Sequence, residues 1–236
     1  MKENQLLVNL PEKERKRLEP YLEPVELEFN QHLLVFDQPI EYVWFPDTCV
    51  TSTVVNSIEG STIEVGLMGT EGMVGLSLVM KLEVSNSTVF VQIPGRAARM
   101  RARDFKKQVV EKGGALLNTL LRYTNFFMAM IAQTAACNTT HPVEERMCRW
   151  ILMTHDRVQQ DQFPLTQEFL ADMLGVRRPS LSKVAGELKR EGLINYTRGS
   201  VTVTDRKGLE ARSCECYQII QGQLKRTFNE GRWSRK

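Results

Sequence analysis

Residues 165–184 have the sequence LTQEFLADMLGVRRPSLSKV, and this stretch decides the fold of the C-terminal part of the chain. Thr166 can cap a first helix over residues 167–174, because its hydroxyl can accept from an amide of the first helical turn. Gly175 follows, where a tight turn between two helices needs a residue that tolerates a positive φ. A second helix is predicted over about residues 179–191, since a proline in the first helical turn removes no helical hydrogen bond.

The apolar residues of this stretch occur where the two helices of a helix-turn-helix must pack together. They are Leu170, Leu174, Val176, Leu181 and Val184, with the small Ala171 at the closest approach. A generic helical hairpin seldom matches all of these positions. The pattern therefore predicts a helix-turn-helix, whose second helix places its N-terminal residues in the major groove of DNA.

Two short β runs follow the second helix, over residues 193–196 and 200–204, around the turn Thr197-Arg198-Gly199. Such a pair with a glycine turn predicts a β-hairpin. After a helix-turn-helix this hairpin is interpreted as a wing, with Arg198 at its tip near the DNA backbone.

The residues predicted to face outward are polar or basic. Arginine can make a bidentate contact to guanine, while serine and lysine can contact bases or phosphates, which supply affinity. A solvated helix face would explain the charge alone, but it would not explain the apolar pattern and the wing. The predicted DNA-binding residues are Thr166, Arg177, Arg178, Ser180, Ser182, Lys183, Lys189, Arg190 and Arg198.

The first hundred or so residues have a different pattern, in which short runs rich in β-branched and aromatic residues alternate with glycine and proline breakers. The runs are Leu33–Phe36, Tyr42–Phe45, Val50–Val55, Thr62–Leu67, Val89–Ile93 and Ala97–Ala102. The breakers include Pro39, Pro46-Asp47, Glu59-Gly60, Gly69–Gly72 and Pro94-Gly95. This arrangement predicts an antiparallel sandwich, barrel or jelly roll.

A long helix is predicted between these two parts. One apolar row alternates spacings of four and three, as in a coiled coil, and comprises Leu116, Leu120, Tyr123, Phe127, Met130, Thr134 and Cys137. A second row comprises Leu117, Leu121, Met128, Ile131 and Ala135. A helix with two apolar faces needs two partners, and the simplest pair is the β-domain and the same helix of a second subunit. The alternative is that the helix lies at the centre of a monomer core. The first row, from Leu116 to Thr134, is predicted to form the dimer interface.

The predicted domains are a β-roll sensor domain over residues 1–112, a dimerisation helix and hinge over 113–141, and the helix-turn-helix domain over 142–236. Pro142 ends the segment Asn138-Thr-Thr-His-Pro142, which is expected to break the helix. A length of 236 residues suits two domains.

The composition is that of a globular protein, with 42% hydrophobic and 25% charged residues. The net charge of +3 is too small to establish a nucleic-acid partner by itself. No apolar stretch approaches the roughly 20 residues of a membrane span, and the N-terminus lacks a signal-peptide core. A cytoplasmic protein is therefore expected, with its five cysteines reduced.

Over nearly its whole length the chain resembles the bacterial Crp/Fnr family, on the glycine-turned β-roll, the long central helix and residues 165–184. The resemblance implies an α+β fold with a cyclic-nucleotide-binding-like jelly roll, a dimerisation helix and a C-terminal winged helix-turn-helix. It also implies a homodimer that binds near-palindromic double-stranded DNA, and RNA polymerase as a partner if the protein is an activator. Arg178, Ser180 and Lys183 match the family's DNA-contacting positions, while Pro179 replaces a glutamate that often accepts from cytosine.

The same resemblance locates an effector pocket at Gly72, Gly75, Leu76, Asn86 and Ser87. Family members that bind cyclic nucleotides have a glutamate at the position of Leu76 and an arginine at the position of Asn86. Burial of a phosphate without a cation is unfavourable. The chain is therefore not expected to bind cyclic AMP in the usual way, and its effector is not identified.

No metal or other cofactor is predicted. The first cysteine, Cys49, lies far from the N-terminal position of the family's iron–sulfur ligands, and His32 is the one histidine of the β-domain. His141 and His155 are interpreted as surface or capping residues. Cys214 and Cys216 are expected on one helix, where positions i and i+2 do not share a face, so chelation by the pair is not expected. Redox sensing by these thiols stays open.

Two alternatives come from other classes of function. One is a ligand-binding regulatory module whose helical domain contacts protein rather than DNA, against which the basic second helix argues. The other is a cupin-like enzyme, which would need several histidine and carboxylate ligands on its strands. The protein is therefore predicted not to be an enzyme.

Overall fold

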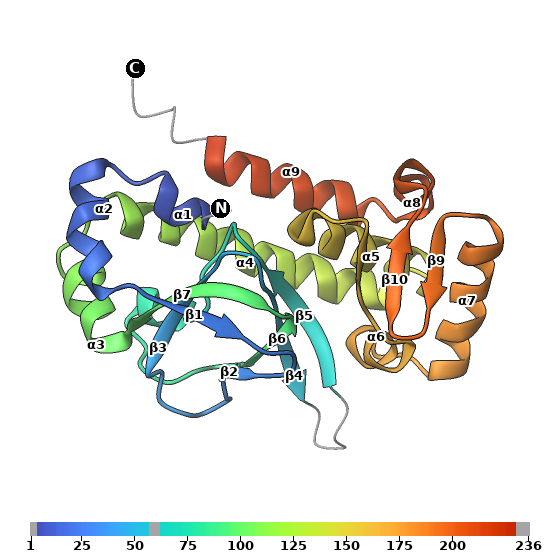
Figure 1. The fold of residues 1–236 in the computed structure, drawn as a ribbon, viewed down its shortest axis with the longest axis horizontal. Helices are drawn as coiled ribbons and strands as arrows, with labels where there is room; N and C mark the ends of the chain where they lie inside the picture. The colour runs from blue at the N-terminus through green and yellow to red at the C-terminus, as the bar shows by residue number, and fades with distance from the viewer. Residues whose placement is uncertain (1–3, 57–61, 230–236) are drawn as a thin grey trace. The chain divides into compact units, whose positions relative to one another are not determined.

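A computed structural model describes residues 4–56 and 62–229 of the chain (Figure 1). The predicted turn at Glu59-Gly60 lies outside these residues. The chain divides into two compact units, the first made of residues 1–53, 68–128 and 223–236 and the second of residues 54–67 and 129–222. Within the described ranges, no helix combines the length and the apolar character that a membrane span requires.

The N-terminal part is built mainly from antiparallel strands, as the sequence predicts. Three short helices precede them: α1 (Gln5–Val8), α2 (Glu12–Leu18) and the 3-10 helix η1 (Glu19–Tyr21). One sheet has the order β1 (Glu23–Leu27), β7 (Gly95–Arg101), β3 (Tyr42–Pro46). The other has the order β2 (His32–Leu34), β6 (Thr88–Ile93), β4 (Val50–Asn56), β5 (Thr62–Met68). Val43, Phe45 and Val91 are fully buried in this part of the core.

Strand β1 is absent from the sequence prediction. Its sequence, EPVEL, contains a proline and two glutamates, which are uncommon inside a sheet. The strand lies at the edge of its sheet, where Pro24 is opposite Ala98 of β7. A proline is tolerated at an edge because its missing amide need not pair with a second neighbour.

The 3-10 helix η2 (Leu76–Met80) lies between β5 and β6. Four helical segments follow β7 and lead to the C-terminal part: α3 (Ala102–Phe105), the π-helix η3 (Lys106–Val110), α4 (Ala115–Thr140) and α5 (Val143–Val158). Helix α4 continues through Thr140, so the helix break predicted from Asn138 onward is shorter than expected. Only His141 and Pro142 separate α4 from α5.

The row of α4 that was predicted to form the dimer interface is buried within the single chain. Leu116, Leu120, Tyr123 and Met130 are 0% exposed, Phe127 is 8% and Thr134 is 5% exposed. In the first unit Tyr123 packs so closely on Gly72 that a side chain at position 72 would overlap the Tyr123 hydroxyl. In the second unit Arg149 lies within 3.4 Å of the Thr134 hydroxyl. This row therefore packs inside the subunit and offers no surface to a second one, contrary to the sequence prediction.

The second row of α4 is the one that remains accessible. Leu121 is 49% exposed and Met128 is 61% exposed. The periodicity thus correctly distinguished two apolar faces, but the row predicted to face a second subunit is the one that this chain itself covers. The periodicity shows that two faces are apolar and does not show which one the rest of the chain covers.

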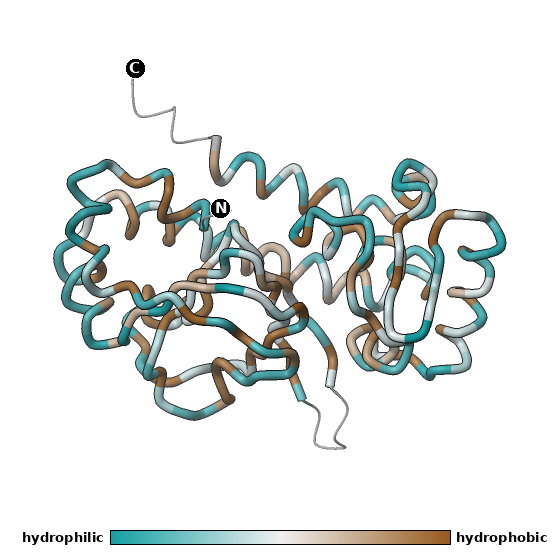
Figure 2. The backbone as a smooth tube through the Cα atoms, in the orientation of Figure 1, coloured by the Kyte–Doolittle hydropathy of each residue, from teal (hydrophilic) through white to brown (hydrophobic). Residues whose placement is uncertain are grey.

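The C-terminal part has the predicted helix-turn-helix and wing. Its elements are β8 (Gln162–Pro164), α6 (Gln167–Leu174), α7 (Arg178–Arg190), β9 (Ile194–Thr197), β10 (Ser200–Val203), α8 (Arg206–Arg212) and α9 (Cys216–Asn229). Leu170, Leu181 and Leu188 are 0% exposed and pack α6 and α7 together. Hydrophobic and hydrophilic residues alternate along these helices in Figure 2, as expected for helices with one buried face.

Candidate nucleic-acid interface

The first helix and the turn are formed as the sequence predicts. The Thr166 hydroxyl accepts from the Phe169 amide at 3.1 Å and caps α6. Gly175 has φ 62° and ψ 41°, the left-handed conformation that ends the helix. The amide of Val176 donates back to the Ala171 carbonyl at 2.9 Å, which fixes the direction of the chain into α7.

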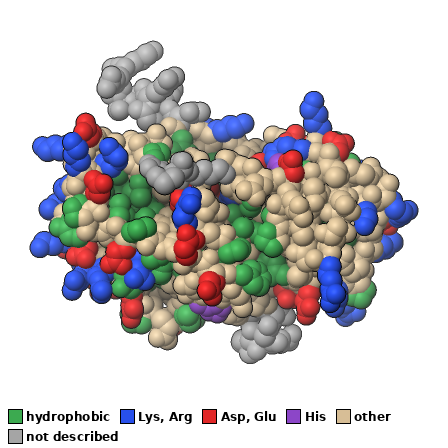
Figure 3. Space-filling view, in the orientation of Figure 1, with side chains coloured by type: hydrophobic (Ala, Val, Ile, Leu, Met, Phe, Trp, Pro, Cys, Tyr) green, Lys and Arg blue, Asp and Glu red, His purple; other side chains and the backbone are tan. Residues whose placement is uncertain are grey.

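Helix α7 presents its basic N-terminal end to solvent. Leu181, Ala185 and Leu188 are buried, which turns the opposite face outward. Arg177 is the N-cap residue and Arg178 the first residue of the helix. The exposed residues at this end include Arg177, Arg178, Ser180 and Lys183. Lys and Arg side chains are visible along the edge of the molecule where α7 lies (Figures 1 and 3).

Three cations at the start of α7 differ from several arginines of the same unit in having no side-chain partner within the described residues. Within the described residues, Arg177, Arg178 and Lys183 form no ion pair or side-chain hydrogen bond. By contrast, Arg206 pairs with Asp156 at 2.6 Å. A cation without a local carboxylate is available to a phosphate or a base edge.

Two predicted DNA-binding residues have partners inside the domain. The Ser182 hydroxyl is half-buried and donates to the Gln167 side-chain oxygen at 2.8 Å, which joins α7 to α6. The Lys189 ammonium donates to the Tyr196 carbonyl at 3.2 Å, which joins α7 to the wing. These bonds hold α7 against α6 and β9, and both Lys189 and Arg190 are exposed.

The wing is a three-stranded sheet of order β8-β10-β9. Arg198 and Gly199 form the turn between β9 and β10, where Gly199 has φ 77° and Arg198 is exposed. Strand β8 was not predicted, because its sequence QFP is short and contains a proline.

Arg212 bonds to Glu144 and to Glu191, each at 2.5 Å, and so links the end of α7 to α5.

The five residues predicted for the effector pocket lie on two neighbouring segments of the first unit. Gly72, Gly75 and Leu76 are buried, whereas Asn86 is exposed and accepts from the Ser77 hydroxyl at 3.5 Å. Ser87 is half-buried. Gly75 has φ 102° and closely approaches Val43, a conformation and a contact that require glycine.

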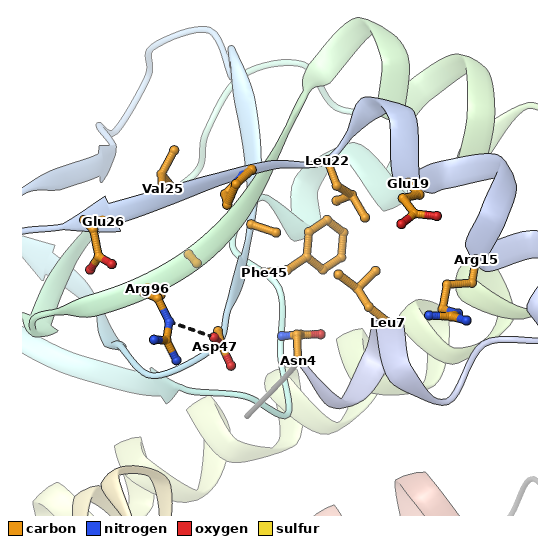
Figure 4. A pocket seen from close by; sticks show the side chains of 13 residues that line it. Asn4, Leu7, Arg15, Glu19, Leu22, Val25, Glu26, Phe45, Asp47 and Arg96 are labelled. Carbon is orange, nitrogen blue, oxygen red and sulfur yellow. Dashed lines mark hydrogen bonds and ion pairs between the residues drawn. The ribbon is translucent and has the colours of Figure 1, made fainter. Parts of the chain in front are cut away.

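A cavity of about 440 Å³ lies elsewhere in the first unit (Figure 4). Its wall includes Leu7, Leu22 and Phe45, and Arg96 bonds to Asp47 at 3.2 Å beside it. None of the five predicted effector residues lines this cavity. The resemblance to cyclic-nucleotide domains gave no indication of it.

The second unit also brings together a group of residues that the sequence prediction kept apart. Cys137, His141, Cys214 and Cys216 have their sulfur and nitrogen atoms within 4.8 Å of one another. Contrary to the sequence prediction, Cys214 and Cys216 do not share one helix, because α8 ends at Arg212 and α9 begins at Cys216. The i, i+4 spacing of Cys137 and His141 at a helix end was the signal that could have revealed the group.

Comparison with known proteins supports the architecture described above. Residues 145–212 match the Crp-like helix-turn-helix domain. A stretch of 58 residues is 38% identical to the HTH-type transcriptional regulator Cmr of Mycobacterium tuberculosis. That stretch is 25% of this chain and spans about a quarter (24%) of the length of the curated relative.

Solved structures resemble the chain over most of its length. A regulator of the Crp/Fnr family from Eubacterium rectale matches with a TM-score of 0.64 at 19% identity, over 88% of this chain and 96% of that one. FixK2 from Bradyrhizobium japonicum matches with a TM-score of 0.69 at 12% identity, over 82% of this chain and 98% of that one. At these identities the likeness establishes the fold. The matched domain establishes a Crp-like helix-turn-helix over residues 145–212.

Proposed function

We propose that the chain regulates transcription by binding a specific, near-palindromic DNA site as a homodimer. The observation that carries this proposal is the set of exposed cations without partners at the start of α7, on a helix-turn-helix of the Crp-like type. In this motif the start of the second helix enters the major groove. Arg177 and Arg178 are positioned there to contact base edges, and arginine pairs bidentately with guanine.

The remaining predicted residues divide into two roles. Lys183, Arg190 and Arg198 are exposed and suit phosphate contacts, which add affinity without sequence preference. Ser182 and Lys189 hold α7 against α6 and the wing. Thr166 caps α6 with one lone pair of its hydroxyl and is exposed, so it can also contact a phosphate.

The outward row of α4 is the candidate surface for a second subunit. Leu121 and Met128 are exposed at a spacing of seven residues, the repeat of a coiled-coil seam. Two such helices side by side would bury both residues in each subunit. A twofold axis along this seam would give the dimer two copies of α7, one for each half of a palindromic site.

Three further parts of the proposal rest on the resemblance to the family. The protein acts in the cytoplasm, and it contacts RNA polymerase if it is an activator. Leu76 and Asn86 replace the residues that hold a cyclic nucleotide, so an effector of the first unit would have a different chemistry. We do not assign that effector to the cavity at Phe45.

The experiment that tests the proposal is selection of bound duplexes from a random library with the full chain. We expect enrichment of two related half-sites whose centres are about one helical turn, roughly 34–36 Å, apart. Enrichment of a single half-site would remove the dimer from the proposal. Failure to enrich any sequence would contradict specific DNA binding and would favour a domain that contacts protein.

A further inference from the structure

We infer that Cys137, His141, Cys214 and Cys216 bind one zinc ion in a tetrahedral site. The three cysteines are 0%, 4% and 0% exposed, and the His141 side chain is 17% exposed. The site joins two segments that lie 77 residues apart in the sequence, the end of α4 and the connection between α8 and α9. All four residues belong to the second unit.

The distances between the ligand atoms fit a single tetrahedral ion. The sulfurs of Cys137 and Cys214 are 3.5 Å apart, and the Cys216 sulfur lies 3.6 Å from Nδ1 of His141. Zinc bonds of about 2.3 Å to sulfur and about 2.0–2.1 Å to nitrogen place tetrahedral ligand atoms roughly 3.5–3.8 Å apart. A cluster of several iron atoms would hold its thiolates on different irons, further apart than the 4.8 Å that bounds this group.

The chain places each ligand by a local feature of its backbone. Cys137 and His141 are one helical turn apart, and the His141 amide still donates to the Cys137 carbonyl at 3.1 Å. The chain turns between α8 and α9, where the Tyr217 amide donates to the Cys214 carbonyl at 3.1 Å. This turn lets Cys214 and Cys216 approach the same point, which two residues within one helix could not do.

The second nitrogen of His141 has the partner that a metal-binding histidine requires. Nε2 lies 3.2 Å from the Glu215 carboxylate, while Nδ1 faces the Cys216 sulfur. A histidine that binds a metal through one ring nitrogen usually donates from the other to a carboxylate, which fixes the ring orientation and the tautomer. Nδ1 also lies 3.1 Å from the Thr140 hydroxyl.

The charges around the group also favour a bound metal with thiolate ligands. Arg146 and Arg149 of α5 are 8% and 3% exposed. No carboxylate of the described chain forms an ion pair with either arginine, and both interact electrostatically with the Cys137 thiol. Burial of unpaired cations is unfavourable. Three thiolates, a neutral imidazole and Zn²⁺ carry a net charge of −1, which offsets the neighbouring positive charge.

An opening from solvent reaches the group. A cavity of about 430 Å³ is lined by Pro142, Glu144, Cys214 and Glu215, among other residues. Arg212 is on the same wall and bonds to Glu144, which leaves Glu145 and Glu215 as the acidic residues of the wall without that partner. The residues needed for ligation, orientation and entry are therefore all present in one unit.

The experiment measures metal content and coordination in the full chain, purified with a phosphine reductant and without chelator. We expect one zinc ion per chain by elemental analysis. After zinc removal, we expect uptake of one Co²⁺ with the visible bands of tetrahedral cobalt and a near-ultraviolet sulfur-to-cobalt band. The cobalt spectrum tests the site without any substitution in the protein.

Substitutions then assign the ligands. Cys214→Ser and His141→Ala should each lose the cobalt spectrum at concentrations that saturate the unaltered chain. Cys148→Ala is the matched control, because Cys148 is a buried thiol of α5 outside the group, and it should keep the spectrum. Burial raises the pKa of Cys148 to about 12, so this thiol stays protonated and unreactive.

Three results would overturn the inference. One is an unaltered, reduced chain that takes up neither zinc nor cobalt. Another is an octahedral cobalt spectrum, or a tetrahedral spectrum that survives Cys214→Ser. The third is a chain without metal whose mass shows a disulfide between Cys137 and Cys214, which would make the group a redox pair instead.

Discussion

At the scale of single residues, ion pairing separates the arginines proposed to bind DNA from those held by carboxylates of the fold. Arg178 has no partner within the described residues, whereas Arg206 and Arg212 are held by carboxylates. All three have the same charge and chemistry. Their different roles follow from which side chains the fold places beside them.

Arg178→Ala should weaken binding to the selected site by about 1–3 kcal/mol, with the loss concentrated at one base position. The reason is that one bidentate contact to a base edge disappears while the phosphate contacts remain. Titration of the selected duplex and of its single-base variants measures the effect. Lys207→Ala, which removes an exposed cation from α8, is the control and should leave the base preference unchanged. Unaltered preference in Arg178→Ala would show that this arginine does not contact a base.

Glu215→Gln tests the orientation of His141 and leaves all four metal ligands in place. We expect zinc affinity to fall by about 10–100-fold with the tetrahedral cobalt spectrum retained, since the carboxylate acts through the imidazole. Competition with a chelator measures the affinity. Glu187→Gln, the same chemical change on α7, should have no effect. Equal affinities in both variants would remove Glu215 from the site.

At the scale of secondary-structure elements, the wing depends on α7 as well as on its own strands. Its sheet pairs β10 with both β8 and β9, and Lys189 of α7 donates to the Tyr196 carbonyl of β9. These bonds set the position of the turn at Arg198 relative to α7. In the proposed complex, the helix and the wing tip would therefore meet a duplex together.

Arg198→Ala should lower affinity equally for selected and random duplexes. It should also reduce the slope of log K against log salt concentration by about 0.9, the value for one phosphate contact. Arg198→Lys keeps the charge and should keep the slope. A loss confined to one DNA sequence would instead indicate that Arg198 contacts a base.

The elements with a strong local pattern could be predicted from the sequence. Leu170, Gly175 and Leu181 define the helix-turn-helix because packing and turn geometry are encoded within twenty neighbouring residues. Strands β1 and β8 were missed because each is short, contains a proline and is specified by its partner strand. The group around Cys137 was missed because it depends on where α4 and α8 end, and helix ends are the least certain part of a sequence prediction.

At the scale of the whole molecule, α4 shows the limit of a periodic pattern. Its two apolar rows are evident in the sequence, but a buried row inside the subunit and a row between subunits have the same spacing. Tyr123 is buried and Met128 is 61% exposed, so the surface available to a partner is the second row. Only the packing of the remaining chain distinguishes the two rows.

The double substitution Leu121→Glu and Met128→Glu should give folded monomers, because it places charges on both sides of the proposed seam. Sedimentation measures the mass, and circular dichroism measures the fold. Phe127→Asp is the contrasting variant and should unfold the chain, since it puts a charge in a site that is 8% exposed. A dimer that persists with both glutamates would exclude this surface.

The net charge of the chain, +3, is too small to attract it to DNA by itself. The proposed DNA recognition therefore depends on where the cations lie. The most direct test is the ratio of dissociation constants for the selected duplex and a scrambled duplex, measured with the full chain at one physiological salt concentration. We predict at least a 10³-fold preference for the selected duplex, the lower end for specific regulators. A ratio near one would contradict the claim that the exposed end of α7 recognises a DNA sequence.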